Sequence, residues 1–302
     1  YDIPFLCNFN HFHFNNTNYY IDIENFTINN IETKINNQSK INIKNYYNIN
    51  FKENISILNI SNLLSNKKID ILGNGPELKN YNWSNNNIKM GFNVAYRYWI
   101  KNNIYPDIYV SLDPVVTEYH ASNIFDLIKS KKIKYFFLNS IFFEKYKETL
   151  FLENVFNFDL LKVFKLINCS PHITTGIFGV KLSIVMGFKD INIYGMNGNY
   201  INYLPECEII KNGNNGVKVL KIIKHVSNNP NYFFNYYQQK GDLYQIPNAN
   251  KEYMCGCDFH KSTIVNQSLH KYVFDVLEFE LKRFNFKYKF IQNEYIKKIT
   301  LY

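Results

Sequence analysis

Short apolar runs alternate with segments of helical character from Lys67 to about Tyr200, and each apolar run ends in small or polar residues. Short runs of β-branched and aromatic residues bounded by such signals are typical of buried strands. Strands that alternate with helices form βαβ units around a parallel sheet. The sequence therefore predicts an α/β fold, a Rossmann-like parallel sheet with helices on both faces.

The expected elements follow one another closely along this part of the chain. We expect a strand followed by a helix within 90–103, further helices within 121–132 and 173–188, and strands within 67–75, 105–114, 133–140 and 189–200. A final helix is expected at about 263–284, because Leu269, Val273, Val276, Leu277 and Leu281 recur at helical spacing. A last strand is expected within 286–295.

Two regions depart from this alternation. Residues 1–66 alternate Ile, Tyr and Phe with polar residues, which predicts a small β-rich N-terminal extension. Residues 199–258 are dense in Asn, Pro and Tyr and show no clear period, and long loops of this kind often form functional lids. We therefore expect an extension over 1–66 and a Rossmann-like domain over 67–302, with a lid at about 199–258.

Charge and composition narrow the classes of partner. The net charge of +9 favours an anionic partner, but no block of Lys and Arg exceeds two residues, so nucleic acid is not expected. The five cysteines are odd in number and scattered, which favours a reducing compartment over a disulfide framework. Cys255 and Cys257 with His260 lack the paired spacing of a zinc site, so no metal is expected.

The expected location is cytoplasmic. No apolar run approaches the ~18 residues that a spanning helix needs, and the first residues lack a signal-peptide pattern. Peripheral contact with the anionic inner face of the cytoplasmic membrane stays open, because the chain is basic. We also expect a homo-oligomer.

The strand ends point to a ligand site. In an open parallel sheet, ligands bind beyond the carboxyl ends of the strands. Here those ends carry Gly73-Asn74-Gly75-Pro76, Gly91-Phe92-Asn93, Ser111-Leu112-Asp113-Pro114, Asn139-Ser140 and Gly195-Met196-Asn197-Gly198. The two glycines of the first turn allow close approach of a ligand to the backbone, although the turn is neither a dinucleotide fingerprint nor a Walker loop.

The start of the helix within 173–188 has two interpretations. Thr174 and Thr175 stand at the expected N-cap and Gly176 in the first turn. A plain threonine cap stabilises a helix by about 1 kcal/mol. A helix start also binds phosphate or carboxylate groups through its free N–H groups. The sequence leaves both interpretations open.

Three segments together resemble a known enzyme family. ILGNGPELK, FNVAYRY and ITTGIFGVKLSIVMGFKDINIYGMNGNY resemble the bacterial sialyltransferases of glycosyltransferase family 42, which carry a GNGPSLK motif and a later ITSG…LGYK…GIDFY block. More distantly, YPDIYVSLDP is similar to a segment of the motility accessory factors that glycosylate flagellin. The resemblance covers about 67–200 well, 255–290 loosely and 1–66 not at all.

The resemblance implies a donor and a set of donor-binding residues. The family transfers a nonulosonic acid, such as sialic acid, from cytidine monophosphate (CMP), on a Rossmann-like, GT-A-like domain with a lid. Transfer inverts the anomeric centre and needs no metal or further cofactor. The positions that match donor-binding motifs are Gly73, Asn74, Gly75, Pro76, Asn93, Asp113, Thr174, Thr175, Gly176, Gly195 and Asn197. Asn197 departs from the pattern, because the family has Asp there.

Catalysis in this family uses a histidine base and tyrosine hydroxyl groups. The base takes the proton from the acceptor hydroxyl, and it precedes the C-terminal helix. His260 fits that place better than His270, and His172 is a third possibility. Tyr200 and Tyr203 match in position the tyrosines that stabilise the leaving phosphate, and Tyr232, Tyr236 and Tyr237 in the expected lid are further candidates.

The function expected from the resemblance is inverting, metal-independent transfer of a sialic acid-like sugar from a CMP donor to an oligosaccharide or glycolipid, such as lipooligosaccharide or capsule. Three alternatives stay open. The acceptor can be a protein such as flagellin. The chain can instead be a pterin diphosphokinase that uses ATP and Mg²⁺. It can also be a nucleotide- or glycan-binding module without catalysis, since Asn197 lacks the charge of the family's Asp.

Overall fold

The computed structural model describes residues 11–14, 17–20, 67–160, 174–197, 201, 204–212, 218–246, 274, 276–278, 281–282, 288–292 and 296–302. The chain divides into two compact units, Tyr1–Asn48 and Ile49–Tyr302. In the first unit, β1 (His11–Phe14) and β2 (Thr17–Tyr20) form an antiparallel pair. The extension expected over 1–66 stays a prediction, because most of it lies outside the described residues.

The second unit is built on an eight-stranded, largely parallel sheet in the order β12-β13-β8-β3-β4-β5-β6-β7. Six neighbouring strands run parallel: β3 (Lys68–Leu72), β4 (Ile88–Phe92), β5 (Ile108–Ser111), β6 (Tyr135–Leu138), β7 (Val155–Asn157) and β8 (Asp190–Tyr194). The predicted mixed α/β class with a parallel sheet is confirmed.

The C-terminal edge of the sheet differs from the expectation. One closing strand was predicted within 286–295, and β12 (Tyr288–Gln292) occupies that place. The chain then adds β13 (Ile296–Leu301), which pairs antiparallel with both β12 and β8. The last part of the sequence is therefore an antiparallel hairpin on a parallel sheet, and the prediction of a single strand was wrong.

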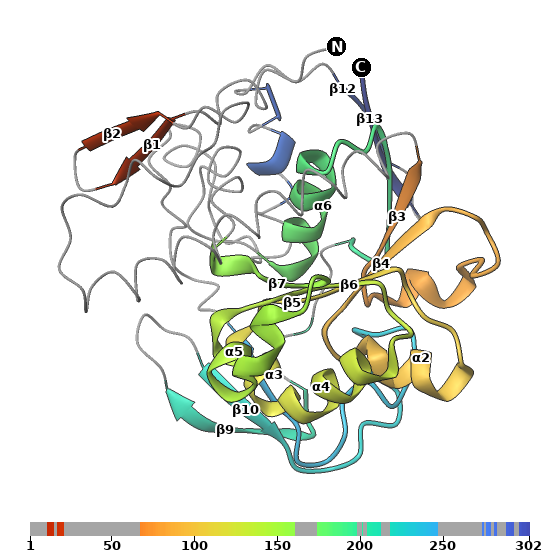
Figure 1. The fold of residues 1–302 in the computed structure, drawn as a ribbon. Helices are drawn as coiled ribbons and strands as arrows, with labels where there is room; N and C mark the ends of the chain where they lie inside the picture. The colour runs from red at the N-terminus through yellow and green to blue at the C-terminus, as the bar shows by residue number, and fades with distance from the viewer. Residues whose placement is uncertain are drawn as a thin grey trace, which may run out of the picture. The chain divides into compact units, whose positions relative to one another are not determined.

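Helices cover both faces of the sheet (Figure 1). The helices α2 (Tyr96–Asn102), α3 (Pro114–Tyr119), α4 (Ala121–Ser130) and α5 (Ser140–Lys145) connect β4 to β7, and α6 (Thr175–Val185) precedes β8. Four short 3-10 helices are also described, η2 (Pro76–Asn80), η3 (Asn93–Ala95), η4 (Lys147–Phe151) and η5 (Phe158–Leu160).

Strand residues alternate between two hydrophobic cores. In β5, Ile108 and Val110 point into the core on the α6 side, and Tyr109 points into the core formed with α2, α4 and α5. In β6, Phe137 faces the first core, and Phe136 and Leu138 face the second. Because both faces of the sheet are covered, residues of both phases of this period of two are apolar in β5 and β6, as the short apolar runs of the sequence indicate.

The C-terminal helix joins the α6 side. Within the predicted helix 263–284, the described residues 274, 276–278 and 281–282 are helical. Val276, Leu277 and Leu281 are buried in the same core as α6. The prediction is confirmed for these residues, and Leu269 and Val273 lie outside the described part.

The strand order creates a switch point beside β3. The chain moves outward from β3 through β4, β5 and β6 to β7, and then returns through α6 to β8 on the other side of β3. The connections on the two sides of β3 therefore lie on opposite faces of the sheet. Such a reversal leaves a crevice at the carboxyl ends of the two strands, where open α/β sheets bind their ligands.

The stretch predicted to be irregular contains a second, smaller sheet. The strands β9 (Cys207–Asn212), β10 (Lys218–Ile222) and β11 (Leu243–Ile246) pair antiparallel, with β10 in the centre. A small core supports it, formed by Leu204, Leu220, Ile222, Val226 and Tyr244. The expectation of irregular structure throughout 199–258 was therefore wrong for these strands.

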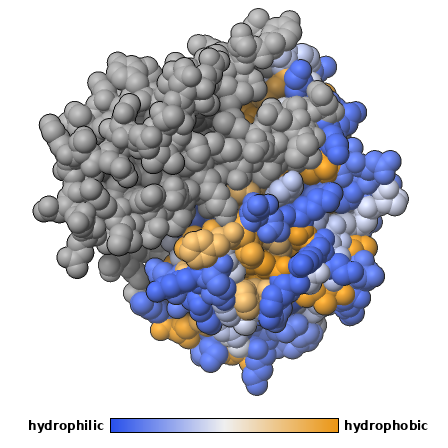
Figure 2. Space-filling view, viewed as in Figure 1, coloured by the Kyte–Doolittle hydropathy of each residue, from blue (hydrophilic) through white to orange (hydrophobic). Residues whose placement is uncertain are grey.

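The surface mixes polar and apolar residues. Figure 2 shows hydrophobic residues in orange among hydrophilic residues in blue on the visible face of the described part. Several large apolar side chains of the described residues are exposed, and Phe151, at 76%, is the most exposed of them. None of the described helices has the length and apolar character that crossing a membrane requires.

Candidate functional site

The candidate site lies along the carboxyl edge of the parallel strands. Directly after the strands come Gly73–Pro76 (β3), Asn93 (β4), Asp113 (after β5), Asn139 (β6) and Gly195–Asn197 (β8). Because β3 and β8 are neighbours, their exits lie side by side at the switch point. The structure thus places all of these residues, which the sequence singled out, along one edge of the sheet.

The exits of β3 and β8 are joined through their backbones. The Gly73 amide donates to the Tyr194 carbonyl at 2.8 Å, and the Gly75 amide donates to the Gly195 carbonyl at 2.9 Å. A Cβ on Gly73 would lie 2.3 Å from the Gly195 carbonyl oxygen. The glycine at 73 is therefore required by contact with the neighbouring exit, whether or not a ligand binds over it.

The start of α6 lies against the same exit. A Cβ on Gly176 would lie 2.5 Å from the Met196 Cε, and a Cβ on Gly73 would lie 2.2 Å from the Met196 Cγ. The side chain of Met196 thus fills the space between the first turn of α6 and the turn after β3. Gly195 has a positive φ of 61°, which suits glycine and lets the chain turn sharply here.

A row of asparagine side chains links neighbouring strand ends. The Asn74 Nδ2 donates to the Tyr237 hydroxyl at 2.9 Å and to the Phe92 carbonyl, the end of β4, at 3.5 Å. The Asn139 Nδ2 donates to the Leu112 carbonyl, just beyond β5, at 3.0 Å. Because a carbonyl only accepts hydrogen bonds, these contacts fix which end of each amide faces the neighbouring strand.

The opposite ends of these amides have no partner among the described residues. The Oδ1 atoms of Asn74, Asn93 and Asn139 are buried and accept no hydrogen bond there. Asn93 lies in the left-handed region, with φ 51°, and its backbone carbonyl accepts from the Tyr109 hydroxyl at 3.0 Å. A buried acceptor without a donor costs about 1–3 kcal/mol. Three such acceptors on one edge favour a ligand that brings hydrogen-bond donors.

Asp113 serves as the N-cap of α3. Its carboxylate accepts from the backbone amides of Val115 at 2.9 Å and Val116 at 3.1 Å. Burial raises the pKa of the Asp113 carboxyl to about 6, against the opposing effect of these two hydrogen bonds. The capping role is thus visible in the structure, and contact with a donor stays a prediction.

The start of α6 shows the cap that the sequence predicts. The Thr174 Oγ1 accepts from the Ile177 amide at 3.3 Å. Thr175 and Gly176 form the first turn, beside the exits of β3 and β8 through the contact of Gly176 with Met196. Both earlier interpretations still hold, because capping through Thr174 does not use the amides of Thr175 and Gly176.

Residues 229–242, here called the cover segment, dock on the exits of β3 and β4. The Phe233 amide donates to the Asn74 carbonyl at 3.1 Å, and the Tyr237 hydroxyl contacts the side chain of Asn74. Phe233, Phe234 and Tyr237 are buried in the core on the α2 side. The rings of Tyr232 and Tyr237 stack with centroids 3.6 Å apart. This part of the predicted lid is therefore packed onto the sheet domain.

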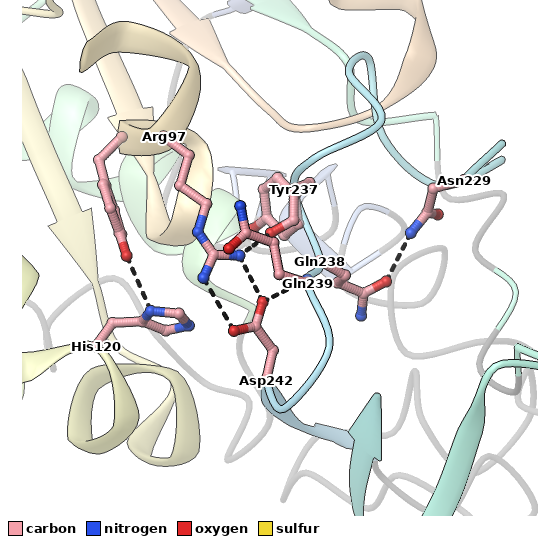
Figure 3. A network of polar contacts seen from close by, with 8 residues as sticks. Arg97, His120, Asn229, Tyr237, Gln238, Gln239 and Asp242 are labelled. Carbon is pink, nitrogen blue, oxygen red and sulfur yellow. Dashed lines mark hydrogen bonds and ion pairs between the residues drawn. The ribbon is translucent and has the colours of Figure 1, made fainter. Parts of the chain in front are cut away.

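An ion pair fastens the cover segment to α2 (Figure 3). The Arg97 guanidinium donates to the two carboxylate oxygens of Asp242 at 2.5 and 2.9 Å, and it also donates to the Tyr237 carbonyl at 2.7 Å. The backbone amide of Gln239 donates to the same carboxylate at 2.7 Å. The side chains of Arg97 and Asp242 are only 15% and 7% exposed, so this is a buried pair.

His120, to which no sequence motif assigns a role, lies beside this pair (Figure 3). Its Nδ1 is 2.9 Å from the Tyr96 hydroxyl, and the residue is buried. Burial lowers the pKa of His120 to about 4, so the ring is neutral at physiological pH. Neutrality lets the imidazole pack next to the guanidinium of Arg97 without charge repulsion.

Sequence reasoning also missed Glu77, which lies at the switch point. The Asn197 Nδ2 donates to the Glu77 Oε1, and the Oε2 of Glu77 is buried without a hydrogen-bond partner among the described residues. The sequence contained an indication of this residue, because GNGPELK has Glu77 where the GNGPSLK motif has Ser.

The predicted catalytic residues lie outside the described residues. These are His260, His270, Tyr200 and Tyr203, together with the further candidate His172. Their roles stay predictions. The described part of the chain also contains no group of three or more His, Cys, Asp or Glu side chains that could hold a metal ion.

Comparison with known proteins finds partial similarity to solved structures. One is the sialyltransferase CstII from Campylobacter jejuni in complex with the substrate analogue CMP-3FNeuAc, which is 20% identical, with a TM-score of 0.31 over 43% of this chain and 58% of that chain. Another is monomeric CstII, 21% identical, with a TM-score of 0.32 over 44% of this chain and 64% of that chain.

The chain thus overlaps less than two thirds of the length of either structure. No protein-family model matches the chain, and no curated protein matches it. A similarity of this extent transfers neither an activity nor a residue role to this chain, so its function has to be inferred from its own motifs and site.

Proposed function

We propose that the chain is an inverting, metal-independent glycosyltransferase that transfers a sialic acid-like, nonulosonic sugar from a CMP-activated donor to a cell-surface glycan. The observation that supports this most is the row of amide oxygens of Asn74, Asn93 and Asn139 along the carboxyl edge of the sheet, which accept no hydrogen bond from any described residue. The choice of donor rests on the resemblance of the strand exits to the family 42 motifs.

The donor nucleotide suits these residues in its chemistry. Cytosine carries an exocyclic amine, and ribose carries two hydroxyl groups, all of which donate hydrogen bonds to amide oxygens. The phosphate is an acceptor and needs a different partner. The amides of Thr175 and Gly176 at the start of α6 offer N–H groups and the positive end of the helix dipole. The base would thus bind to the asparagine row and the phosphate to the helix start, with the ribose between them.

The transfer step needs a base and a stabilised leaving group. In the proposed reaction the acceptor hydroxyl oxygen attacks the anomeric carbon of the sugar from the face opposite the phosphate. The bond from that carbon to the phosphate oxygen breaks, CMP leaves, and the configuration inverts. His260, with His270 as the alternative, would take the hydroxyl proton. Tyr200 and Tyr203 would donate hydrogen bonds to the phosphate as charge builds on it.

The cover segment would exclude water from this site. It already contacts Asn74 through the Phe233 amide and the Tyr237 hydroxyl. Excluding water strengthens the hydrogen bonds to the nucleotide and protects an activated sugar from hydrolysis. The acceptor would be an oligosaccharide or a glycolipid such as lipooligosaccharide or capsule, at the inner face of the membrane. A flagellin-type protein acceptor is the alternative suggested by residues 105–114.

Incubation with a CMP-activated nonulosonic sugar tests the proposal. Wild-type protein should release CMP and free sugar slowly, without Mg²⁺, and should transfer sugar once a suitable acceptor glycan is added. His260→Ala should bind CMP normally and release nothing. A wild-type protein that binds CMP but never consumes such a donor would instead be a binding module without catalysis, and the transferase proposal would be wrong.

A further inference from the structure

Glu77 places a carboxylate between the exits of β3 and β8. It is the second residue of η2, just beyond the turn after β3. Its Oε2 lies 2.6 Å from where a Cβ on Gly75 would stand, so the side chain folds back over that turn. Its Oε1 accepts a hydrogen bond from Asn197 at the exit of β8. The carboxylate therefore bridges the two exits that form the switch point.

This carboxylate is only half satisfied. Its Oε2 is buried and accepts no hydrogen bond within the part of the chain that the structure describes. Asp70, a fully buried residue on the same stretch of chain, shows the usual arrangement for carboxylate oxygens that are out of contact with solvent. Its two oxygens accept hydrogen bonds at 2.7–3.0 Å from Tyr81, Asn85, Asn87 and Asn192. Buried carboxylate oxygens are stable when donors reach them, and no described residue donates to the Oε2 of Glu77.

The residues at positions 77 and 197 both differ from the resembled motifs, and the two differences are related. The resembled motifs have Ser in place of Glu77 and Asp in place of Asn197. Their carboxylate therefore follows the strand that corresponds to β8, whereas in this chain the carboxylate follows β3. With Asp at 197, two negative charges would face each other where a hydrogen bond now forms. The two departures from the motifs therefore form one compensated exchange, which keeps a single carboxylate at the switch point.

We propose that Glu77 is the residue that accepts hydrogen bonds from the ribose hydroxyl groups of the donor nucleotide, an inference that rests on the proposed function. Of the parts of CMP, the phosphate is repelled by a carboxylate. The two neighbouring hydroxyl groups of ribose are donors that one carboxylate accepts together. Acidic side chains bind ribose hydroxyl groups in this way in other doubly wound folds. Asn197 holds the carboxylate in position through Oε1.

Calorimetric titrations with CMP and 2′,3′-dideoxy-CMP test this assignment. Glu77→Gln keeps the shape of the side chain but removes its charge. It should weaken CMP binding about tenfold or more, which is the usual worth of hydrogen bonds to a charged group. The same variant should bind dideoxy-CMP nearly as well as wild type does. Glu148→Gln, which removes one charge from an exposed residue of η4, is the matched control and should bind both ligands normally.

A swap of the two residues gives a second test. Asn197→Asp alone should weaken CMP binding, because it sets a second carboxylate against Glu77. The double variant Glu77→Ser, Asn197→Asp should recover most of the affinity for CMP. Equal losses on CMP and dideoxy-CMP, no loss in Glu77→Gln, or no recovery in the swap would overturn the assignment. Failure of wild-type protein to bind CMP would instead overturn the proposed function on which it rests.

Discussion

The buried pair of Arg97 and Asp242 leads to a quantitative prediction. Asp242→Ala takes both carboxylate oxygens away from the guanidinium of Arg97, which keeps its hydrogen bond to the Tyr237 carbonyl, and deprives the backbone amide of Gln239 of its acceptor. At the effective dielectric constant of about 20 that suits protein charges, two unit charges ~4 Å apart attract by about 4 kcal/mol. Removing one partner of a buried pair costs about 3–5 kcal/mol. We expect Asp242→Ala to lower the free energy of unfolding by that amount.

The assay is urea unfolding of wild type and variants. With an m-value of roughly 2.5 kcal/mol/M, the expected loss shifts the midpoint by about 1–2 M urea. The double variant Arg97→Ala, Asp242→Ala should lose less than the sum of the single variants, because neither charge is then left buried alone. Since the pair fastens the cover segment, the single variants should also bind CMP more weakly.

A surface pair on the same chain provides the control. Asp126 and Lys129 lie 2.8 Å apart on α4, with side chains 67% and 59% exposed. Exposed pairs contribute about 0–1 kcal/mol, so Asp126→Ala should hardly change stability. If Asp242→Ala costs no more than Asp126→Ala, the cover segment is not held by this ion pair, and its role in forming the site is refuted.

Three further predictions concern single side chains. Tyr237→Phe removes the hydroxyl that holds the Asn74 amide, so CMP affinity should fall about fivefold in calorimetry while unfolding free energy changes by only about 1 kcal/mol. His120 has a lowered folded pKa of about 4, so its contribution to stability is complete above pH 6.5 and is lost as pH falls towards 4. The difference in unfolding free energy between wild type and His120→Asn should therefore narrow by about 3 kcal/mol over that range in pH-dependent unfolding. Asp113 titrates in both proteins, so its contribution cancels from this difference. Thr174→Ala should cost about 1 kcal/mol in urea unfolding and leave CMP affinity unchanged if Thr174 only caps α6, whereas a loss of affinity would show that it also binds the ligand.

The sheet and its edge could be predicted because each strand is short, apolar and followed by a polar exit. The runs at 67–75 and 133–140 gave β3 and β6 directly, and the positions of Asn74 and Asn139 followed from them. The strands β9 and β10 also had a signal, since two strand-like runs flank GNNG at 213–216, a sequence typical of hairpins. The high asparagine content of the whole chain concealed it.

The contacts that complete the site could not be predicted in this way. Arg97 and Asp242 are 145 residues apart. Although Arg97 lies within FNVAYRY, nothing in that segment indicates that its partner is Asp242. Asn74 and Tyr237 are 163 residues apart. Period and local spacing give elements and strand ends, but they contain no information about which distant segments dock together. The choice of glycine at 73 also depends on the neighbouring exit of β8, which local sequence does not reveal.

The central claim is that the carboxyl edge of the sheet binds CMP. Calorimetric titration of the purified chain with CMP, UMP, GDP and ATP, each with and without Mg²⁺, tests it most directly. Selective binding of CMP that does not depend on Mg²⁺, and that is lost in Asn74→Ala without loss of the fold, is the predicted result. Preference for another nucleotide, or no binding of any of them, would contradict the claim and leave the motifs as marks of a shared fold alone.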